Sequence, residues 1–285
     1  MISVVQLGTV DYATGLRLQQ QLVALRKEGK IGDVLLLLEH KPVITLGRNA
    51  RSANVIASPE LLKDRGVEVF ECDRGGDVTF HGPGQIVGYP IFDLRARVKA
   101  DALAHPDSAR RTMGVIEFVR KLEDVLMRAC ADFSIPTKRV AGLTGVWTSP
   151  EVAQDHVGAE PLLRPVERSS TAPEAKLAAI GVDISRFVTS HGFALNVNTD
   201  LSYFDLIVPC GITTKSVTSM QKELGRALDM TEVAESISRN FGVVFQSQIL
   251  WIDTIDALLG RTIGVPMTPP KEFRQLQKED ESTWA

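Results

Sequence analysis

Two side chains in the second half of the chain have the types and the spacing for nucleophilic chemistry. Lys176 opens an apolar run, and Cys210 stands between a proline and a glycine, which places it on a loop. Residues 177–184 and 193–197 are typical of neighbouring strands, with a turn at 190–192, so strand pairing can bring the lysine beside the thiol. An ammonium within about 4 to 6 Å lowers the pKa of a thiol by roughly 1 to 3 units, from about 8.5. The pair therefore predicts a nucleophilic cysteine, and a small buried thiol is the alternative.

A glycine-rich stretch upstream, RGGDVTFHGPGQIVGYP from Arg74 to Pro90, could approach a substrate. Its apolar residues alternate as in half-buried strands, and glycines inside strands mark places where a ligand or another backbone comes close. The Gly75-Gly76 pair offers unhindered N–H groups, with Arg74 as a fixed cation beside them. The stretch lacks the Gly-Lys-Ser/Thr of a phosphate loop, and a structural hairpin with a bulge is the alternative. His81 either touches substrate or satisfies a turn carbonyl, and His191 is expected to orient its turn.

Length and composition place the chain among large α/β proteins. Its 285 residues, 44% of them hydrophobic, can bury a sizeable core. The formal net charge of -3, without a Lys/Arg-rich run or an aromatic RNA motif, gives no case for nucleic-acid binding. Three cysteines without a close pair form neither a disulfide framework nor a zinc ligand set, which is typical of a reducing compartment. Without an apolar run of about 18 residues or a targeting segment, we expect a cytoplasmic protein that does not span a membrane.

The spacing of apolar residues, together with the glycines, prolines and capping residues between them, divides the chain into strands and helices. Apolar runs of strand length lie at 4–7, 33–40, 43–46 and 67–72, and a turn and strand are expected within 138–148. Helices are expected at 12–27, 112–133, 218–224 and 230–241, and a short one follows Ser58-Pro59, where a serine cap precedes a proline. Residues 149–175 lose periodicity and gather prolines, which predicts a mobile surface insertion. We therefore expect a catalytic domain over 1–245 and a partly disordered C-terminal extension over 246–285.

Taken together, these motifs resemble one known family. RGGDVTFHGPGQ, the KLAAIG run, the SHGFALN turn and the PCGI cysteine have the order and spacing of the lipoyl (octanoyl) transferases, the LipB-type enzymes, over about residues 3–242. The resemblance implies an α/β (α+β) fold with a mixed central β-sheet flanked by helices, the catalytic-domain type of biotin/lipoate protein ligases. It also implies that an octanoyl group passes from octanoyl-acyl carrier protein to a lysine of lipoyl domains, in 2-oxoacid dehydrogenase complexes and in the glycine cleavage H protein.

The resemblance also assigns roles by position. It makes Cys210 the nucleophile and Lys176 the residue that lowers the pKa of its thiol. It implies no cofactor and no metal, and we expect a monomer. The implied acyl-substrate site comprises Arg74, Gly75, Gly76, Asp77, Val78, Thr79, Phe80 and His81, then Ala179, Ile180 and Gly181, and finally Gly192, Phe193 and Ala194.

The residues agree with such a reaction on chemical grounds. A thioester donor is already activated and needs neither ATP nor a metal, which fits the missing phosphate loop and ligand cluster. The thiolate would take the acyl group, and the neutral acceptor amine would then attack the acyl-enzyme, with Lys176 as proton acceptor. N–H groups beside Cys210 or in the Gly75-Gly76 turn are candidate oxyanion donors, each worth about 3 to 4 kcal/mol. An eight-carbon chain needs an apolar slot about 10 Å long, for which the candidates are Val78, Phe80, Ile180 and Phe193.

The chain departs from the family in two segments and leaves two other enzyme classes open. The 149–175 insertion and the C-terminal tail are longer than in compact bacterial members, so a mitochondrial location stays open for a eukaryotic source. An ATP-dependent lipoate or biotin ligase of the same fold would activate the free acid and would not need Cys210. A cysteine-dependent thioester hydrolase would use His81 or His191 as its base.

Overall fold

The computed structural model describes residues 1–95, 112–149, 174–211 and 215–261. In this part of the chain the main sheet contains β1 (Ile2–Val10), β2 (Asp33–His40), β6 (Gln85–Ile91), β7 (Thr137–Val140), β8 (Leu143–Thr148), β9 (Ala175–Ser185), β10 (Val188–Asn196), β11 (Ser216–Val217) and β12 (Ile249–Trp251). Their order is β12-β1-β2-β6-β10-β9-β8-β7, with β11 paired to β9. β1 is parallel to β2 and β12, and β11 to β9, whereas the other pairs are antiparallel. The predicted mixed sheet is confirmed.

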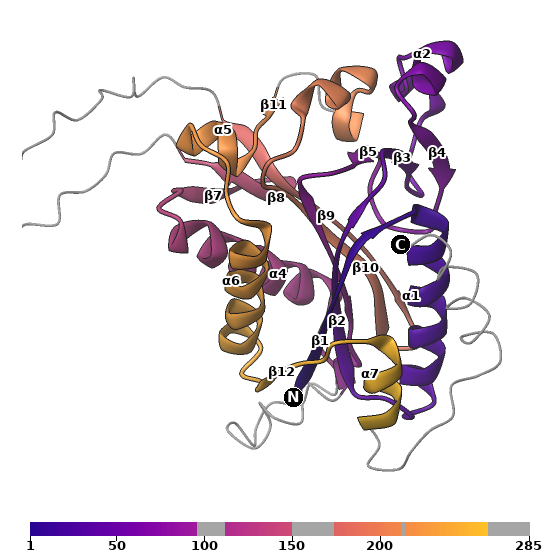
Figure 1. Cartoon of the computed structure of the whole chain (residues 1–285), viewed down its shortest axis with the longest axis vertical. Helices are drawn as coiled ribbons and strands as arrows, with labels where there is room; N and C mark the ends of the chain where they lie inside the picture. The colour runs from indigo at the N-terminus through magenta and orange to yellow at the C-terminus, as the bar shows by residue number, and fades with distance from the viewer. Residues whose placement is uncertain (96–111, 150–173, 212–214, 262–285) are drawn as a thin grey trace, which may run out of the picture.

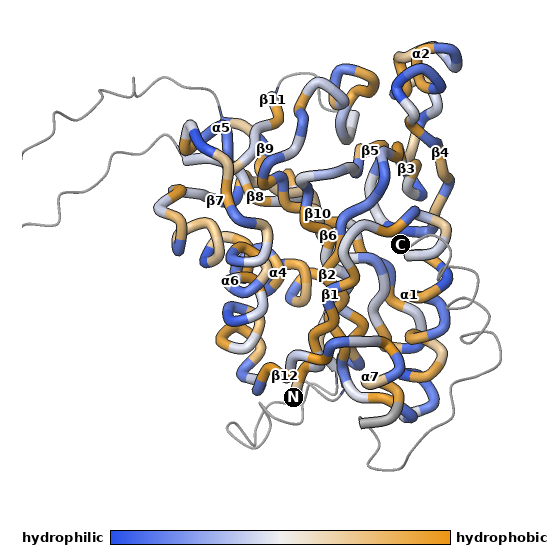
Figure 2. Tube along the Cα trace, viewed as in Figure 1, coloured by the Kyte–Doolittle hydropathy of each residue, from blue (hydrophilic) through white to orange (hydrophobic). Residues whose placement is uncertain are grey.

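Helices cover both faces of the main sheet, as Figure 1 shows. α1 (Tyr12–Lys27) and α7 (Ile255–Arg261) lie on one face, and α4 (Val115–Asp132) and α6 (Met230–Val244) on the other. Strand residues alternate between the two cores, since Ile2 and Val4 pack with α4 and α6 while Val5 packs with α1 and α7. Figure 2 shows apolar residues along the strands of this sheet. β2 is buried on both sides, as its continuous apolar run predicts.

A second sheet of three strands stands at one end of the main sheet. β3 (Val43–Leu46) lies between the parallel β4 (Glu68–Glu71) and the antiparallel β5 (Val78–His81). Its core joins Leu62 of α2 (Pro59–Asp64) to Phe204 and Leu206 of the 3₁₀ helix η2 (Leu201–Leu206). This cluster therefore ties the small sheet to the segment that leads into η3 (Pro209–Gly211), which contains Cys210. The remaining short elements are η1 (Ser52–Asn54) and α5 (Met220–Leu224).

Capping residues begin the helices where their side chains can satisfy free N–H groups. Asp11 accepts the Thr14 N–H at 2.8 Å at the start of α1, and Ser58 accepts the Leu61 N–H at 3.3 Å at the start of α2. Asp229 does the same for α6 through the Thr231 N–H at 2.7 Å. The predicted serine cap before Pro59 is confirmed.

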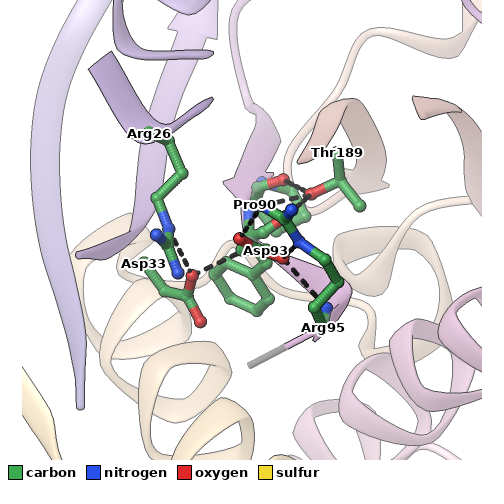
Figure 3. A network of polar contacts seen from close by, with 7 residues as sticks. Arg26, Asp33, Pro90, Asp93, Arg95 and Thr189 are labelled. Atoms are coloured by element: carbon green, nitrogen blue, oxygen red, sulfur yellow. Dashed lines mark hydrogen bonds and ion pairs between the residues drawn. The ribbon is translucent and has the colours of Figure 1, made fainter. Parts of the chain in front are cut away.

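A polar network holds α1 to the ends of β2, β6 and β10 (Figure 3). Asp33 Oδ1 accepts from Arg26 Nε at 2.9 Å and from the Asp93 N–H at 3.0 Å. The Thr189 hydroxyl donates to the Pro90 carbonyl at 2.6 Å and accepts the N–H of the residue that follows β6 at 2.9 Å. Because Pro90 has no N–H to contribute to the sheet, these contacts keep β6 and β10 together beyond it.

Several expected boundaries differ from the structure. Residues 190–192 lie inside β10, and the chain instead reverses at Arg186 and Phe187, which have φ of 50° and 70°. The Ser-His-Gly sequence is typical of a turn, but pairing with β9 continues through it. α6 passes through Gly242 to Val244, and β5 and β6 are buried on both faces rather than half-buried.

The expected domain boundary after residue 245 also differs from the packing. β12 pairs with the edge of β1, and α7 buries Leu258 and Leu259 in the core beside α1. Residues 249–261 therefore belong to the same folded unit as the sheet. Most of the expected 149–175 insertion (150–173), and the tail after residue 261, lie outside the described residues.

Candidate active site

A cavity of about 570 Å³ lies between the main sheet and the three-stranded sheet. Its floor comes from β6, β9 and β10, one wall from β5 and the loop before it, and its rim from residues 49–54 and the β7–β8 turn. Most of the acyl-site residues predicted from the sequence line it, namely Arg74, Gly75, Gly76, Asp77, Thr79, His81, Ala179, Ile180, Gly181, Gly192, Phe193 and Ala194, together with Lys176. Segments far apart in the sequence thus meet around one cavity.

Lys176 and the turn that contains Cys210 meet at one end of this cavity. Lys176 is 8% exposed, and its Nζ lies 4.8 Å from the centre of the buried Trp147 ring. Gly211 also lines the cavity, in the left-handed conformation at φ 65°, and its N–H donates to the Val208 carbonyl at 3.0 Å. The side chain of Cys210 lies outside the described residues. Pro209, the residue before Cys210, and Lys176 line one small pocket beside this cavity, so the backbone of the predicted nucleophile and the predicted lysine lie at the same end.

Asp77 fixes the turn around Cys210 against the cavity rim. Its Oδ2 accepts from Asn54 Nδ2 at 2.6 Å, and its Oδ1 accepts the N–H groups of Val78 at 2.7 Å and Arg51 at 3.3 Å. The Asn54 carbonyl in turn accepts the Val208 N–H at 2.7 Å. A side chain at Gly211 would come within 2.9 Å of Asp77 Oδ2, so the carboxylate and the turn are in close contact. Asp77 therefore has a positioning role in this structure.

Arg74 holds the glycine-rich loop onto the small sheet. The guanidinium is buried and donates from Nη2 to the Thr45 carbonyl at 2.6 Å, from Nε to Thr45 Oγ1 at 3.1 Å and from Nη1 to the Gly75 carbonyl at 3.1 Å. The Gly75 N–H donates to the Val182 carbonyl at 3.1 Å, so it is already used and is not a free oxyanion donor. A Cβ at Gly181 would lie 2.6 Å from the Gly75 carbonyl oxygen. Close approach of the two backbones is why this strand position needs glycine.

The cavity floor is formed by small residues on paired strands. Ala179 pairs with Ala194, and Gly181 pairs with Gly192, and all four line the cavity. A Cβ at Gly192 would lie 2.1 Å from the Gly88 carbonyl oxygen, so the next strand also requires this glycine. Side chains of this size leave room above the sheet for a ligand.

The four residues predicted to form the acyl slot have side chains that face away from the cavity. Val78 and Phe80 are absent from its lining and pack in the core of the small sheet with Ile44 and Leu62. Side chains alternate along a strand, so Thr79 and His81 on β5 face the cavity instead. The expectation that Val78 and Phe80 line an acyl slot is therefore wrong. Ile180 and Phe193 border the cavity, but their side chains pack in the core on the α4 and α6 face, where the Phe193 ring stacks on Phe241 at a centroid distance of 6.0 Å. The expectation that these two side chains form the slot is therefore wrong as well.

Two buried histidines beside the cavity are neutral at pH 7. Burial lowers the pKa of His40 to about 4 and that of His81 to about 3. His40 Nδ1 donates to the Val10 carbonyl at 2.8 Å, which leaves Nε2 to accept from the Tyr89 hydroxyl at 2.6 Å. His81 Nδ1 lies 2.8 Å from Gln85 Oε1, the acceptor end of an amide whose Nε2 donates to the Phe80 carbonyl. Both imidazoles are therefore held in one tautomer by the protein.

His191 closes the cavity at the end away from Lys176. Its Nε2 lies 2.7 Å from Asp73 Oδ1, and its N–H donates to Gln19 Oε1 at 2.7 Å. Burial lowers the pKa of His191, although the Asp73 carboxylate opposes the shift. The residue has φ of 55°, inside a strand. The expected orienting role in a turn is thus replaced by a place in the cavity wall.

Several lining residues carry no signal in the sequence. Tyr12 and Tyr89 are buried aromatic residues whose rings are packed beside His40, at centroid distances of 5.2 and 5.9 Å. The place of Tyr12 depends on how α1 crosses the sheet, and that of Tyr89 on which face of β6 meets the cavity; no local pattern reports either. The remaining residues of this kind are Asn49, Arg51, Asn54, Val87, Gly142, Leu143 and Thr144; a turn near Gly142 is predicted, but its position at the cavity rim is not.

In the described part of the chain, no group of three His, Cys, Asp or Glu side chains is arranged to hold a metal ion. No helix of the described residues has the length and apolar character needed to cross a membrane.

Burial raises the pKa of the Cys130 thiol to about 12, which makes it a core residue rather than a nucleophile.

Comparisons with known proteins agree with this geometry. The sequence profile of the family described as "Lipoyl protein ligase A/B catalytic domain" matches residues 11–242. The octanoyltransferase of Koribacter versatilis is 55% identical over 280 residues, 98% of each chain, and that of Acidobacterium capsulatum is 50% identical over 261 residues, 91% of this chain and 96% of the relative. The bipartite lipoate protein ligase of Thermoplasma acidophilum superimposes with a TM-score of 0.62 at 14% identity, covering 98% of this chain and 91% of that structure. At that identity, the structural likeness supports the fold alone.

The family match spans most of the chain, and the most similar of these relatives cover almost all of it. The chain belongs to the lipoyl protein ligase A/B catalytic-domain family and, within it, to the LipB-type octanoyltransferases, which are acyltransferases.

Proposed function

We propose that the enzyme transfers an octanoyl group from octanoyl-acyl carrier protein to a specific lysine of lipoyl domains, through a thioester on Cys210. The acceptors would be the lipoyl domains of 2-oxoacid dehydrogenase complexes and the glycine cleavage H protein. The observation that carries this proposal is the cavity that has Lys176 and the Cys210 turn at one end, in a chain so similar to octanoyltransferases. Its floor of alanine and glycine leaves space for an acyl chain.

In the first half-reaction, the Cys210 thiolate attacks the donor carbonyl. A neighbouring ammonium stabilises that thiolate, because opposite charges a few ångströms apart favour the charged forms. The new C–S bond to Cys210 forms as the bond to the carrier sulfur breaks. The carrier thiolate then takes a proton from Lys176, which becomes neutral.

In the second half-reaction, the acceptor lysine attacks the acyl-enzyme as a neutral amine. The amide C–N bond forms and the C–S bond to Cys210 breaks, and the proton lost by the attacking nitrogen passes to Lys176. The thiolate and ammonium are thereby restored. The donor thioester and the enzyme thioester are of similar energy, and the product is an amide. The reaction therefore needs no external energy source.

The histidine geometry weighs against a hydrolase. A general base works best when its pKa lies near the working pH, whereas burial lowers the pKa of His81 to about 3. His191 is bonded to Asp73 at the far end of the cavity from Lys176. His81 is therefore a poor base at pH 7, and His191 lies away from Lys176 along β9 and β10.

A transfer assay tests the proposal and its alternatives. The protein is incubated with octanoyl-acyl carrier protein and a lipoyl domain without ATP, and the lipoyl domain is weighed by mass spectrometry. Cys210→Ser and Lys176→Ala should each lower the rate by at least roughly 100-fold, as loss of a nucleophile or its proton acceptor does. Cys72→Ser, which changes a half-buried thiol away from the cavity lining, is the matched control.

Three results would contradict the proposal. Near-full transfer by Cys210→Ser or Lys176→Ala would refute the mechanism. A strict requirement for ATP with free octanoate would identify a ligase. Release of octanoate at the same rate with and without a lipoyl domain would identify a hydrolase.

A further inference from the structure

The cavity has a defined length along the sheet, and its length bears on which acyl chains fit. It follows β9 and β10 from Lys176 to His191, whose partner on β9 is Val182. At the usual strand rise, the backbones of Lys176 and Val182 lie roughly 20 Å apart. The lysine side chain and the thioester occupy the first part of that path. The remainder is comparable to an extended eight-carbon chain of about 10 Å.

The far end of this path is closed by the His191 imidazole. Its side chain is 4% exposed and lines the cavity, whereas the Asp73 carboxylate to which Nε2 is bonded is 65% exposed. The ring therefore lies between the cavity and the solvent. On the cavity side it packs against the Tyr89 ring, at a centroid distance of 6.5 Å and an interplanar angle of 85°.

The backbone keeps this ring in place. His191 has φ of 55°, a conformation that few residues other than glycine adopt readily, and its N–H is held by Gln19 Oε1 at 2.7 Å. Together with the Asp73 contact at 2.7 Å, these restraints fix the imidazole from both ends. A longer acyl chain could pass this point only by displacing a ring that is held in this way.

We propose that the His191 imidazole, anchored to Asp73, is the stop that limits the acyl chain to about eight carbons. The inference rests on the proposed function and adds a specificity-determining residue to it. The stop acts through the volume of the ring. Replacing His191 by glycine should therefore open a path from the cavity to the solvent, and glycine suits the backbone conformation already present.

The test is a donor series with acyl-carrier proteins loaded with chains of six to fourteen carbons, and a lipoyl domain as acceptor. The wild-type enzyme should prefer the eight-carbon donor over the twelve-carbon donor by at least about tenfold in kcat/KM. His191→Gly should raise the ratio of kcat/KM for the twelve-carbon donor to kcat/KM for the eight-carbon donor by at least about tenfold. Arg186→Gly is the matched control, because it places glycine at another left-handed position, φ 50°, in the exposed turn of the same two strands. It should keep the wild-type ratio.

The possible results distinguish failure of this inference from failure of the proposed function. An unchanged ratio in folded His191→Gly would overturn the inference while octanoyl transfer itself stands. Absence of octanoyl transfer by the wild-type enzyme would instead overturn the proposed function, and the inference with it. If His191→Gly does not fold, His191→Asn, which also tolerates positive φ and has a smaller side chain, should raise the ratio in the same direction; a wild-type ratio there would contradict the stop.

Discussion

The neutral histidines beside the cavity predict a steep loss of stability on mild acidification. Burial lowers the pKa of His40 to about 4 and that of His81 to about 3, whereas an unfolded histidine titrates near 6.5. Between these values the unfolded chain binds more protons than the folded chain. The contribution to stability is therefore complete above about pH 6.5 and is lost as the pH falls towards 4.

The size of this effect follows from the same pKa values. Lowering the pH from 7 to 5 should cost roughly 2 kcal/mol for each histidine, or about 4 kcal/mol for both. The lowered pKa of His191 acts in the same direction. Because a domain has only about 5 to 15 kcal/mol of stability, this loss is a large fraction of the total.

Urea unfolding followed by tryptophan fluorescence at pH 7, 6 and 5 measures the effect. His40→Gln is the matched variant, since its amide can donate to the Val10 carbonyl and accept from the Tyr89 hydroxyl without titrating. It should remove about half of the loss. Equal free energies of unfolding at pH 7 and 5 in the wild-type protein, or the full loss retained in His40→Gln, would refute the reasoning.

Three further substitutions test the packing that positions the site. Gly181→Val places a side chain against the Gly75 carbonyl, 2.6 Å from the Cβ position, and should lower the transfer rate at least about tenfold; Gly114→Ala, where a methyl group meets no described atom within 4 Å, should leave it unchanged. Asp77→Ala removes the acceptor that fixes the rim and the Cys210 turn. It should slow formation of the acyl-enzyme about tenfold and lower the free energy of unfolding by roughly 1 to 3 kcal/mol. An acylation rate equal to that of the wild-type enzyme would show that Asp77 does not have this role. Glu123→Gln replaces a fully buried carboxylate that bridges two arginines and holds the β7–β8 hairpin. Urea unfolding at pH 7 should show a free energy of unfolding lower by roughly 1 to 3 kcal/mol. A variant as stable as the wild-type protein, or more stable, would contradict this role of Glu123.

Local chemistry explains which parts of the fold could be predicted from the sequence. The continuous apolar run at 33–40 becomes a strand buried on both faces, and the serine cap before Pro59 starts α2. The motifs around Lys176 and the glycine-rich loop also meet at one cavity. For the strand and the helix cap the signal lies within a few residues, whereas the motifs that meet at the cavity were placed together by their resemblance to a known family.

The remaining features depend on contacts between distant segments. Alternation in 78–81 distinguishes two faces of a strand but not which of them meets a ligand, so Val78 and Phe80 were assigned to the wrong side. Tyr12 reaches the cavity through the crossing of α1 over the sheet. The place of His191 inside β10 requires a positive φ that sequence alone does not reveal.

The central claim is that the acyl group passes through a covalent thioester on Cys210. Intact mass spectrometry of the protein after incubation with octanoyl-acyl carrier protein, in the absence of an acceptor, tests it most directly. The account predicts one octanoyl adduct that hydroxylamine removes and that Cys210→Ser does not form. An unmodified wild-type protein that still octanoylates lipoyl domains, or an equal adduct on Cys210→Ser, would contradict it.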